Sequence, residues 1–275
     1  MSRPFPDAAR PAAESPDFPD LPAIGRAGFQ LVLHPSGAVY LPECKTWLVA
    51  DAHFGKAVSF RLLGVPVPRG TTTGTLERLS ALLDARPTDR IVFLGDFLHS
   101  ARSHAESTQS SLAAWRSAHP GLHLTLVRGN HDDRAGDPPA ALGIEVVDEP
   151  LMFESQSGQA SNRLALCHHP QAIEGAYVLA GHWHPCVTVR GRANDRLRLP
   201  CFWFAEEDPA ESEPSGSGSG SAVLRRQGAA PDRKRAAVGI LPAFGVFTGM
   251  HPIERRSGDL VFAIAGALVR QLPEF

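Results

Sequence analysis

Apolar and polar positions alternate in two different ways along this chain. In the first half, short apolar runs that predict buried strands are separated by helical patterns. The apolar runs are residues 29–33, 37–41, 46–50, 90–94 and 122–127. After a loop rich in Gly and Pro, Leu76, Leu79 and Leu83 recur at helical spacing within residues 73–85, and residues 106–119 predict a second helix. Strands that alternate with helices favour an α/β layered fold.

The second half of the chain is dense in short apolar runs with few helical patterns. These runs are residues 143–148, 151–155, 163–167, 176–180, 186–190, 199–204 and 238–244. Closely spaced strands joined by turns favour a sandwich of two β-sheets. We therefore predict an α/β protein in which two sheets are flanked by helices.

Two segments break these patterns. Residues 1–27 are rich in Pro, Ala and Asp and predict a disordered leader before a single domain over residues 28–275. Residues 205–237 run from acidic through Gly-Ser to basic, which predicts a flexible insert between two core strands. A solvated loop is the favoured interpretation of this insert, and a basic arm that touches a polyanion is the alternative.

The amino-acid composition limits both the class of protein and its cellular compartment. The formal net charge of −2 over 275 residues is not that of a basic nucleic-acid binder, so any polyanion contact must come from a local patch or from bound cations. The four cysteines form no CxxC pair, which argues against a disulfide framework and fits a reduced cytoplasm. No signal-peptide core is present, and the apolar run 260–269 is too short to cross a bilayer and reads as a strand. We expect a cytoplasmic protein with no membrane partner.

Side chains that bind metals follow five of the predicted strands. They are Asp51 and His53; Asp96; Asn130, His131 and Asp132; His168 and His169; and His182 and His184. Ligands gather at the carboxyl ends of strands in α/β sheets, so we expect these groups to meet. Carboxylate, imidazole and amide ligands without thiolate suit Mn, Fe, Zn or Ni better than a Ca or Mg cage. The number of side chains is too large for one ion, whereas two ions sharing Asp96 would use them all.

The spacing of these residues makes further predictions. Asp51 and His53 are two apart, so they point the same way in an extended segment, and His182 and His184 do likewise. His168 and His169 are adjacent and point apart, so at most one of them joins the site readily. Each motif taken alone is weak, because a lone Gly-Asp or Gly-Asn-His-Asp is often a turn or a helix cap. The ordered set favours a metal site.

The order D-x-H, G-D, G-N-H-D, a strand-end His and G-H-x-H, from Asp51 to His184, resembles the calcineurin-like metallophosphoesterases. The segments "VADAHFGKAVSFRLLGVPVPRGTT", "IVFLGDFLHS", "RLRLPCFWF" and "LPAFGVFTG" further resemble the bacterial ligase-associated DNA damage response endonucleases. This resemblance covers roughly residues 28–270 without the insert. One departure is that His169 stands where related sequences often have Glu.

The resemblance implies a sandwich of two mixed sheets and a dinuclear site, with manganese as the usual metal. It assigns the ligands of one metal to Asp51, His53, Asp96 and His184, and those of the other to Asp96, Asn130, His168 and His182. His131 is implied as the catalytic histidine, with Asp132 beside it. Lys56, His99 and Arg128 lie near the motifs and are candidates for contacts with DNA phosphates.

The function that the resemblance implies is a Mn-dependent endonuclease for single-stranded or flap DNA in DNA repair, associated with a DNA ligase, a helicase and an exonuclease. Two metal ions would promote attack of hydroxide on the phosphodiester. A phosphatase or phosphodiesterase for nucleotides or other small phosphoesters remains the alternative, because it would use the same centre. A non-catalytic scaffold is disfavoured, since the full set of ligands and the catalytic histidine are present.

Overall fold

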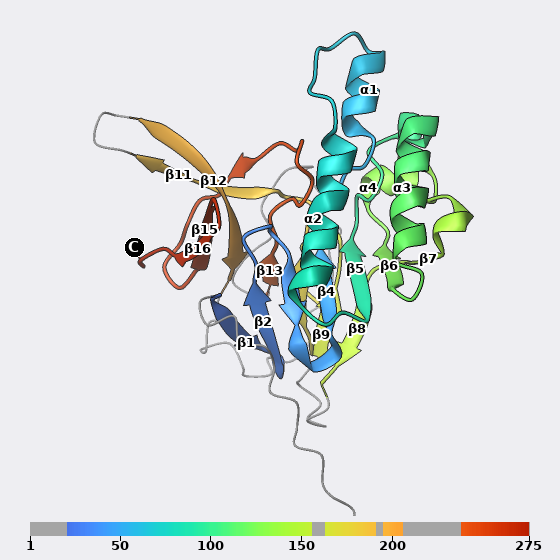
Figure 1. The fold of residues 1–275 in the computed structure, drawn as a ribbon. Coiled ribbons are helices and arrows are strands. Elements are labelled where there is room, and N and C mark those ends of the chain that lie inside the picture. The colour runs from blue at the N-terminus through green and yellow to red at the C-terminus, as the bar shows by residue number, and fades with distance from the viewer. Residues whose placement is uncertain (1–20, 156–162, 191–194, 206–237, 275) are drawn as a thin grey trace, which may run out of the picture.

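Two mixed β-sheets packed face to face form the body of the protein, with helices on one side (Figure 1). The structure is a computed structural model that describes residues 21–155, 163–190, 195–205 and 238–274. Among these residues, no helix is long and apolar enough to span a bilayer. The predicted α/β sandwich of two sheets is confirmed.

The first sheet runs in the order β1-β2-β3-β4-β5-β6-β7. Its strands are β1 (Ala23–Arg26), β2 (Phe29–Leu33), β3 (Val39–Leu41), β4 (Thr46–Val49), β5 (Arg90–Leu94), β6 (His123–Val127) and β7 (Ile144–Val147). The strands from β1 to β4 pair antiparallel, and those from β4 to β7 pair parallel. The carboxyl ends of β4, β5 and β6 therefore meet at one edge.

The second sheet runs in the order β14-β11-β12-β13-β10-β9-β8, and β15 pairs with both β12 and β16. Its strands are β8 (Leu151–Glu154), β9 (Arg163–Leu166), β10 (Tyr177–Ala180), β11 (Pro185–Arg190), β12 (Arg196–Phe204), β13 (Val238–Ile240), β14 (His251–Pro252), β15 (Leu260–Ala265) and β16 (Leu268–Gln271). Strands β9, β10 and β13 are mutually parallel neighbours. Their carboxyl ends also share one edge.

The helices are α1 (Lys56–Leu62), α2 (Thr71–Ala85), α3 (Glu106–Ala118) and α4 (Asn130–Ala135), with 3-10 turns η1 (Pro42–Cys44), η2 (Ala101–His104) and η3 (Ala140–Leu142). Strand β4 shows how the layers are built, because successive side chains of a strand face opposite sides of the sheet. Trp47 and Val49 pack in the core under α2 and α3, whereas Leu48 and Ala50 pack in the core between the two sheets. The first sheet is thus buried on both faces.

Three sequence predictions need correction. The leader was expected to reach residue 27, but Ala23–Arg26 forms β1, because a turn at Ala27 and Gly28 returns the chain to pair with β2. The expected loop before α2 contains α1. The apolar run 260–269 is split into two strands by a turn at Gly266. Residues 1–20 of the leader and 206–237 of the insert lie outside the described residues.

Candidate metal centre

The loops that follow five strands bring the predicted ligands together. The first sheet contributes the loops after β4, β5 and β6, and the second contributes those after β9 and β10. Four groups of His and Asp side chains place their ligand atoms within 4.8 Å of one another and could hold metal ions. Two of these groups combine residues of both sheets, so the site exists only when the sheets are packed.

The backbone of the site differs from the extended form that the spacing predicted. Asp51, His53, Asp96, His182 and His184 all have left-handed φ angles of 54°, 47°, 51°, 70° and 46°. Residues other than glycine rarely adopt this backbone conformation, and it costs about 1–3 kcal/mol for each residue. Such strain collects at functional sites, where it aims a side chain that a regular strand would direct elsewhere.

Glycines allow the loops to approach one another closely. A Cβ atom added at Gly95 would lie 2.1 Å from Nδ1 of His168, and one added at Gly129 would lie 2.4 Å from the backbone nitrogen of Asp96. Both distances are too short for any side chain. These glycines are therefore required by the packing of the centre.

The first cluster joins Asp51, His53, Asp96 and His184. Nε2 of His184 lies 3.3 Å from Nε2 of His53 and 3.4 Å from Oδ1 of Asp51. Nε2 of His53 lies 3.7 Å from Oδ2 of Asp96. Oδ1 of Asp51 is buried and has no hydrogen-bond partner among the residues that the structure describes, although an unpaired buried carboxylate oxygen is costly. A cation between these atoms would relieve that cost.

The second cluster surrounds Nε2 of His168, which is fully buried. This atom lies 3.0 Å from Oδ1 of Asn130, 3.0 Å from Nδ1 of His182 and 3.4 Å from Oδ1 of Asp96. Nδ1 of His168 donates to the carbonyl oxygen of Leu94 at 3.0 Å, which holds Nε2 toward these three atoms. This orientation of a histidine through its second nitrogen is typical of metal ligands.

Burial makes the imidazoles suitable as ligands. It lowers the pKa of His53 far below its usual range, with the positive charge of Lys56 acting in the same direction. Burial, together with the neighbouring His168 and His169, lowers the pKa of His182 to about 4. Neutral imidazole is the form that binds a metal. Burial also raises the pKa of Asp96, because it disfavours the ionised carboxylate. A bound cation would offset this cost of ionisation.

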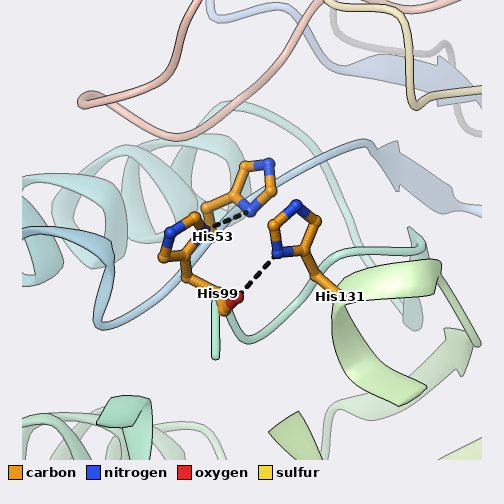
Figure 2. Close-up of side chains that lie close together, drawn as sticks. All are labelled: His53, His99 and His131. Atoms are coloured by element: carbon orange, nitrogen blue, oxygen red, sulfur yellow. Dashed lines mark hydrogen bonds between the residues drawn. The ribbon is translucent and has the colours of Figure 1, made fainter. Parts of the chain in front are cut away.

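His131 and His99 lie beside the first cluster (Figure 2). Nδ1 of His131 donates to the carbonyl oxygen of His99 at 2.7 Å, and the two rings stack with centroids 4.8 Å apart. Nδ1 of His99 lies 3.5 Å from Nδ1 of His53. His131 therefore has a fixed orientation at the margin of the cluster, with Nε2 3.9 Å from Oδ2 of Asp96.

Asp132 lies behind the centre and holds two loops together. Its Oδ1 accepts a hydrogen bond from the backbone of Leu98 at 3.0 Å, and its Oδ2 accepts from Gly129 at 3.0 Å and Phe97 at 3.4 Å. Burial raises the pKa of Asp132 to about 6. These bonds tie the loop of Asp96 to the loop of His131.

Glu149 is a functional candidate that the sequence did not reveal. Its Oε2 accepts hydrogen bonds from the backbone nitrogens of His168 and His169 at 2.7 and 2.9 Å, and its Oε1 lies 2.8 Å from Nδ1 of His169. The expectation that His169 points away from His168 is wrong: their rings lie 4.7 Å apart, and the ligand atoms of His168, His169 and His182 lie within 4.8 Å of one another. Glu149 follows β7, the edge strand of the first sheet, and belongs to no motif, so only the fold places it beside His168.

The two candidate basic contacts differ in their surroundings. Lys56 begins α1 and is partly buried, and burial lowers its pKa while Asp51 and Asp96 act to raise it. Arg128 forms ion pairs with Asp137 at 2.5 Å, Asp148 at 3.7 Å and Asp133 at 4.0 Å. The charge of Arg128 is thus offset by its own neighbours.

Several chains with known structures resemble this one, including one from Pseudomonas putida and one from Aquifex aeolicus. The Pseudomonas putida nuclease MPE is 35% identical, covers 92% of this chain and 100% of its own, and superposes with a TM-score of 0.69. The Aquifex aeolicus protein of unknown function AQ665 is 21% identical over 50% of this chain and 78% of its own, and its TM-score of 0.36 is too low to support a conclusion. No family model and no curated protein matches the chain.

The two mixed sheets and the clustered His and Asp side chains define a metallophosphoesterase fold with a site that could hold metal ions. Because the match to the Pseudomonas putida nuclease extends over its whole length, this chain belongs to the same family, which fits the ligase-associated DNA damage response endonucleases of the metallophosphoesterase superfamily. It is accordingly an enzyme, a hydrolase of phosphoester bonds.

Proposed function

We propose that this protein is a DNA endonuclease that uses two divalent metal ions. The proposal rests on one observation. The two clusters of ligand atoms lie next to different oxygens of the same carboxylate, that of Asp96. Oδ2 of Asp96 faces His53 at 3.7 Å, and Oδ1 of Asp96 faces His168 at 3.4 Å. One ion would be held by Asp51, His53, Asp96 and His184, and the other by Asp96, Asn130, His168 and His182.

The donor set fits two cations on chemical grounds. Oδ1 of Asp51 faces Nε2 of His184 at 3.4 Å, and Nε2 of His168 faces Oδ1 of Asp96 at 3.4 Å. Mixed carboxylate, imidazole and amide ligands suit manganese, and also iron, zinc or nickel. Two ions bound there would polarise the phosphodiester and lower the pKa of the attacking water. We propose Mn²⁺ as the working metal.

The protein's own residues perform the remaining tasks. His131, oriented through the carbonyl oxygen of His99, holds a proton at Nε2 for the leaving oxygen, a general-acid contribution of about 10²–10⁴-fold. Asp132 positions the loop that carries His131, since both its oxygens accept backbone hydrogen bonds. Lys56 and His99 are available for contacts with phosphate, whereas the ion pairs of Arg128 make it a weaker candidate.

The substrate that we propose is single-stranded or flap DNA. The Pseudomonas putida relative is a nuclease, and the family resemblance favours DNA over small phosphoesters. We further propose a role in DNA repair in the cytoplasm, in association with a DNA ligase, a helicase and an exonuclease. The thiols of all four cysteines are free, which is compatible with a reducing compartment.

A comparison of substrates tests this function. The purified protein with Mn²⁺ is incubated with single-stranded, flap and duplex DNA, with RNA, and with a bis-aryl phosphodiester. We expect cleavage of single-stranded and flap DNA and of the aryl ester. Cleavage of the aryl ester with all DNA intact would instead favour the phosphodiesterase for small molecules.

A matched pair of variants tests the shared carboxylate. Asp96→Asn should abolish metal-dependent cleavage of DNA and of the aryl ester, because neither ion would keep its ligand set. Asp148→Asn removes a carboxylate with 94% of its side chain exposed and should retain normal activity. Near-normal activity of Asp96→Asn would refute the bridging assignment.

A further inference from the structure

Exposed apolar side chains gather at the outer end of α1. Leu62, Leu63 and Val65 are 64%, 62% and 42% exposed. Helix α1 and the loop that follows it project beyond the end of α2 (Figure 1). Large apolar side chains grouped in this way often mark an interaction site.

A second exposed apolar segment lies next to α1. Val246 and Met250, which follow β13, are 44% and 38% exposed. The rings of Phe60 and Phe247 pack perpendicular to each other with centroids 6.0 Å apart, which joins this segment to α1. We name the two segments together, residues 60–69 and 246–250, the α1 rim.

The α1 rim adjoins the metal centre at both of its segments. The Phe60 ring lies 6.0 Å from the ring of His99, which in turn contacts His53. The carbonyl oxygen of Gly249 accepts the hydrogen bond that orients Nδ1 of His184, at 3.1 Å. A polymer held at the centre would therefore extend over the α1 rim.

The charged side chains of the α1 rim itself are cationic. Residues 60–69 and 246–250 contain no Asp or Glu, and their Arg61 and Arg69 are both exposed. Lys56 at the start of α1 and the exposed Arg102 in η2 are further cations in neighbouring segments. On the side of α4, by contrast, exposed Asp133, Asp137 and Asp148 surround Arg128. In a chain with a net charge of −2, this uneven distribution complements a polyanion.

We propose that the α1 rim binds the unpaired nucleotides next to the phosphate that is cleaved. This inference rests on the proposed DNA endonuclease activity. An unpaired nucleotide presents an apolar base face and a charged phosphate at every step. Apolar side chains contact or wedge between bases, and arginines bind phosphates. The α1 rim offers both kinds of side chain beside the centre, so its occupant is a DNA strand.

Two variants and a matched control test the α1 rim. The double variant Leu62→Ser, Leu63→Ser removes the apolar contact, and Arg69→Gln removes a charge. Leu268→Ser is the control, because Leu268 is 56% exposed on β16, outside the α1 rim. For each protein with Mn²⁺, kcat/KM is measured for single-stranded DNA and for a bis-aryl phosphodiester, and the mass in solution is measured by light scattering.

We expect the double variant to lose about tenfold or more in kcat/KM for DNA, because both leucines lose the apolar area that they bury against a base. Arg69→Gln should weaken DNA cleavage most at low salt, because salt screens phosphate contacts. The aryl ester is too small to reach the α1 rim, so its kcat/KM should stay within about twofold of the wild type. Leu268→Ser should match the wild type on both substrates.

Three results would overturn the inference. Unchanged DNA cleavage by the double variant would show that the α1 rim does not bind the strand. Equal losses of kcat/KM on both substrates would show that the α1 rim stabilises the metal centre and does not bind the strand. A dimeric wild type that becomes monomeric in the double variant would identify a second copy as the occupant. A wild type that hydrolyses the aryl ester but no DNA would refute the proposed function itself.

Discussion

Nε2 of His168 lies 3.4 Å from Oδ1 of Asp96, and both side chains are almost completely buried. Because Nδ1 of His168 donates a hydrogen bond to the carbonyl oxygen of Leu94, the ring is held with Nε2 toward the carboxylate. A divalent cation bound at this point would contact both the ring and the carboxylate. Metal binding should therefore stabilise the packing of the loops that carry them.

Metal removal should lower thermal stability. A ligand that binds only the folded state stabilises it by about 2.7 kcal/mol at a free concentration of 100 times its Kd. We expect chelation by EDTA to lower the Tm by several degrees and Mn²⁺ to restore it, as measured by calorimetry. Asp96→Asn should lose this response to Mn²⁺. A Tm that is the same with and without metal would contradict the predicted linkage.

His168 and His169 should differ in their effects on activity. His168→Ala removes a buried side chain from the centre, so we expect loss of nearly all Mn²⁺-dependent hydrolysis of an aryl phosphodiester. His169→Ala changes a side chain that is 43% exposed at the margin, and most activity should remain. Each variant is the control for the other. The reverse order of effects would identify His169 as the ligand in place of His168.

Glu149 should act on metal affinity through His168. Its Oε2 accepts the backbone hydrogen bonds of both His168 and His169, and its Oε1 pairs with the ring of His169. Loss of such outer partners of a ligand typically weakens metal binding about 10–100-fold. We expect Glu149→Gln to weaken Mn²⁺ binding, measured by titration calorimetry, by an amount in this range. Glu154→Gln, an exposed carboxylate paired with Arg163, is the control and should bind Mn²⁺ normally. Equal affinity in the two variants would exclude a positioning role.

Asp132 should contribute to stability as well as to activity. In Asp132→Ala the backbone nitrogens of Leu98 and Gly129 lose their partner in a buried region. An unsatisfied buried donor costs about 1–3 kcal/mol, so urea denaturation should show a loss of at least this size. Asp133→Ala changes the exposed neighbouring carboxylate and should unfold like the wild type. If both variants had the same stability, Asp132 would not tie the two loops together.

The sequence predicted the strands of the first sheet well because each is short, apolar and bounded by turns. Strands β2, β5 and β6 lie within one residue of the predicted runs. Helix α1 was missed, because its seven residues lie in a segment rich in Gly and Pro. Strand β1 was missed because a run of four residues beside a Pro-rich leader has no periodic pattern of its own.

The sequence alone determined which side chains are candidates for the centre, because their types, order and positions after apolar strands are all visible in the chain. It did not determine the backbone conformation of these residues. Asp51 and His53 were expected to share a face of an extended segment, yet both adopt left-handed φ angles that only the surrounding packing can maintain. The tertiary structure also decided that Glu149 supports His168 and that α1 stands exposed beside the centre. These relationships join residues that are distant in sequence, so they arise only when the two sheets pack and bring the loops to one edge.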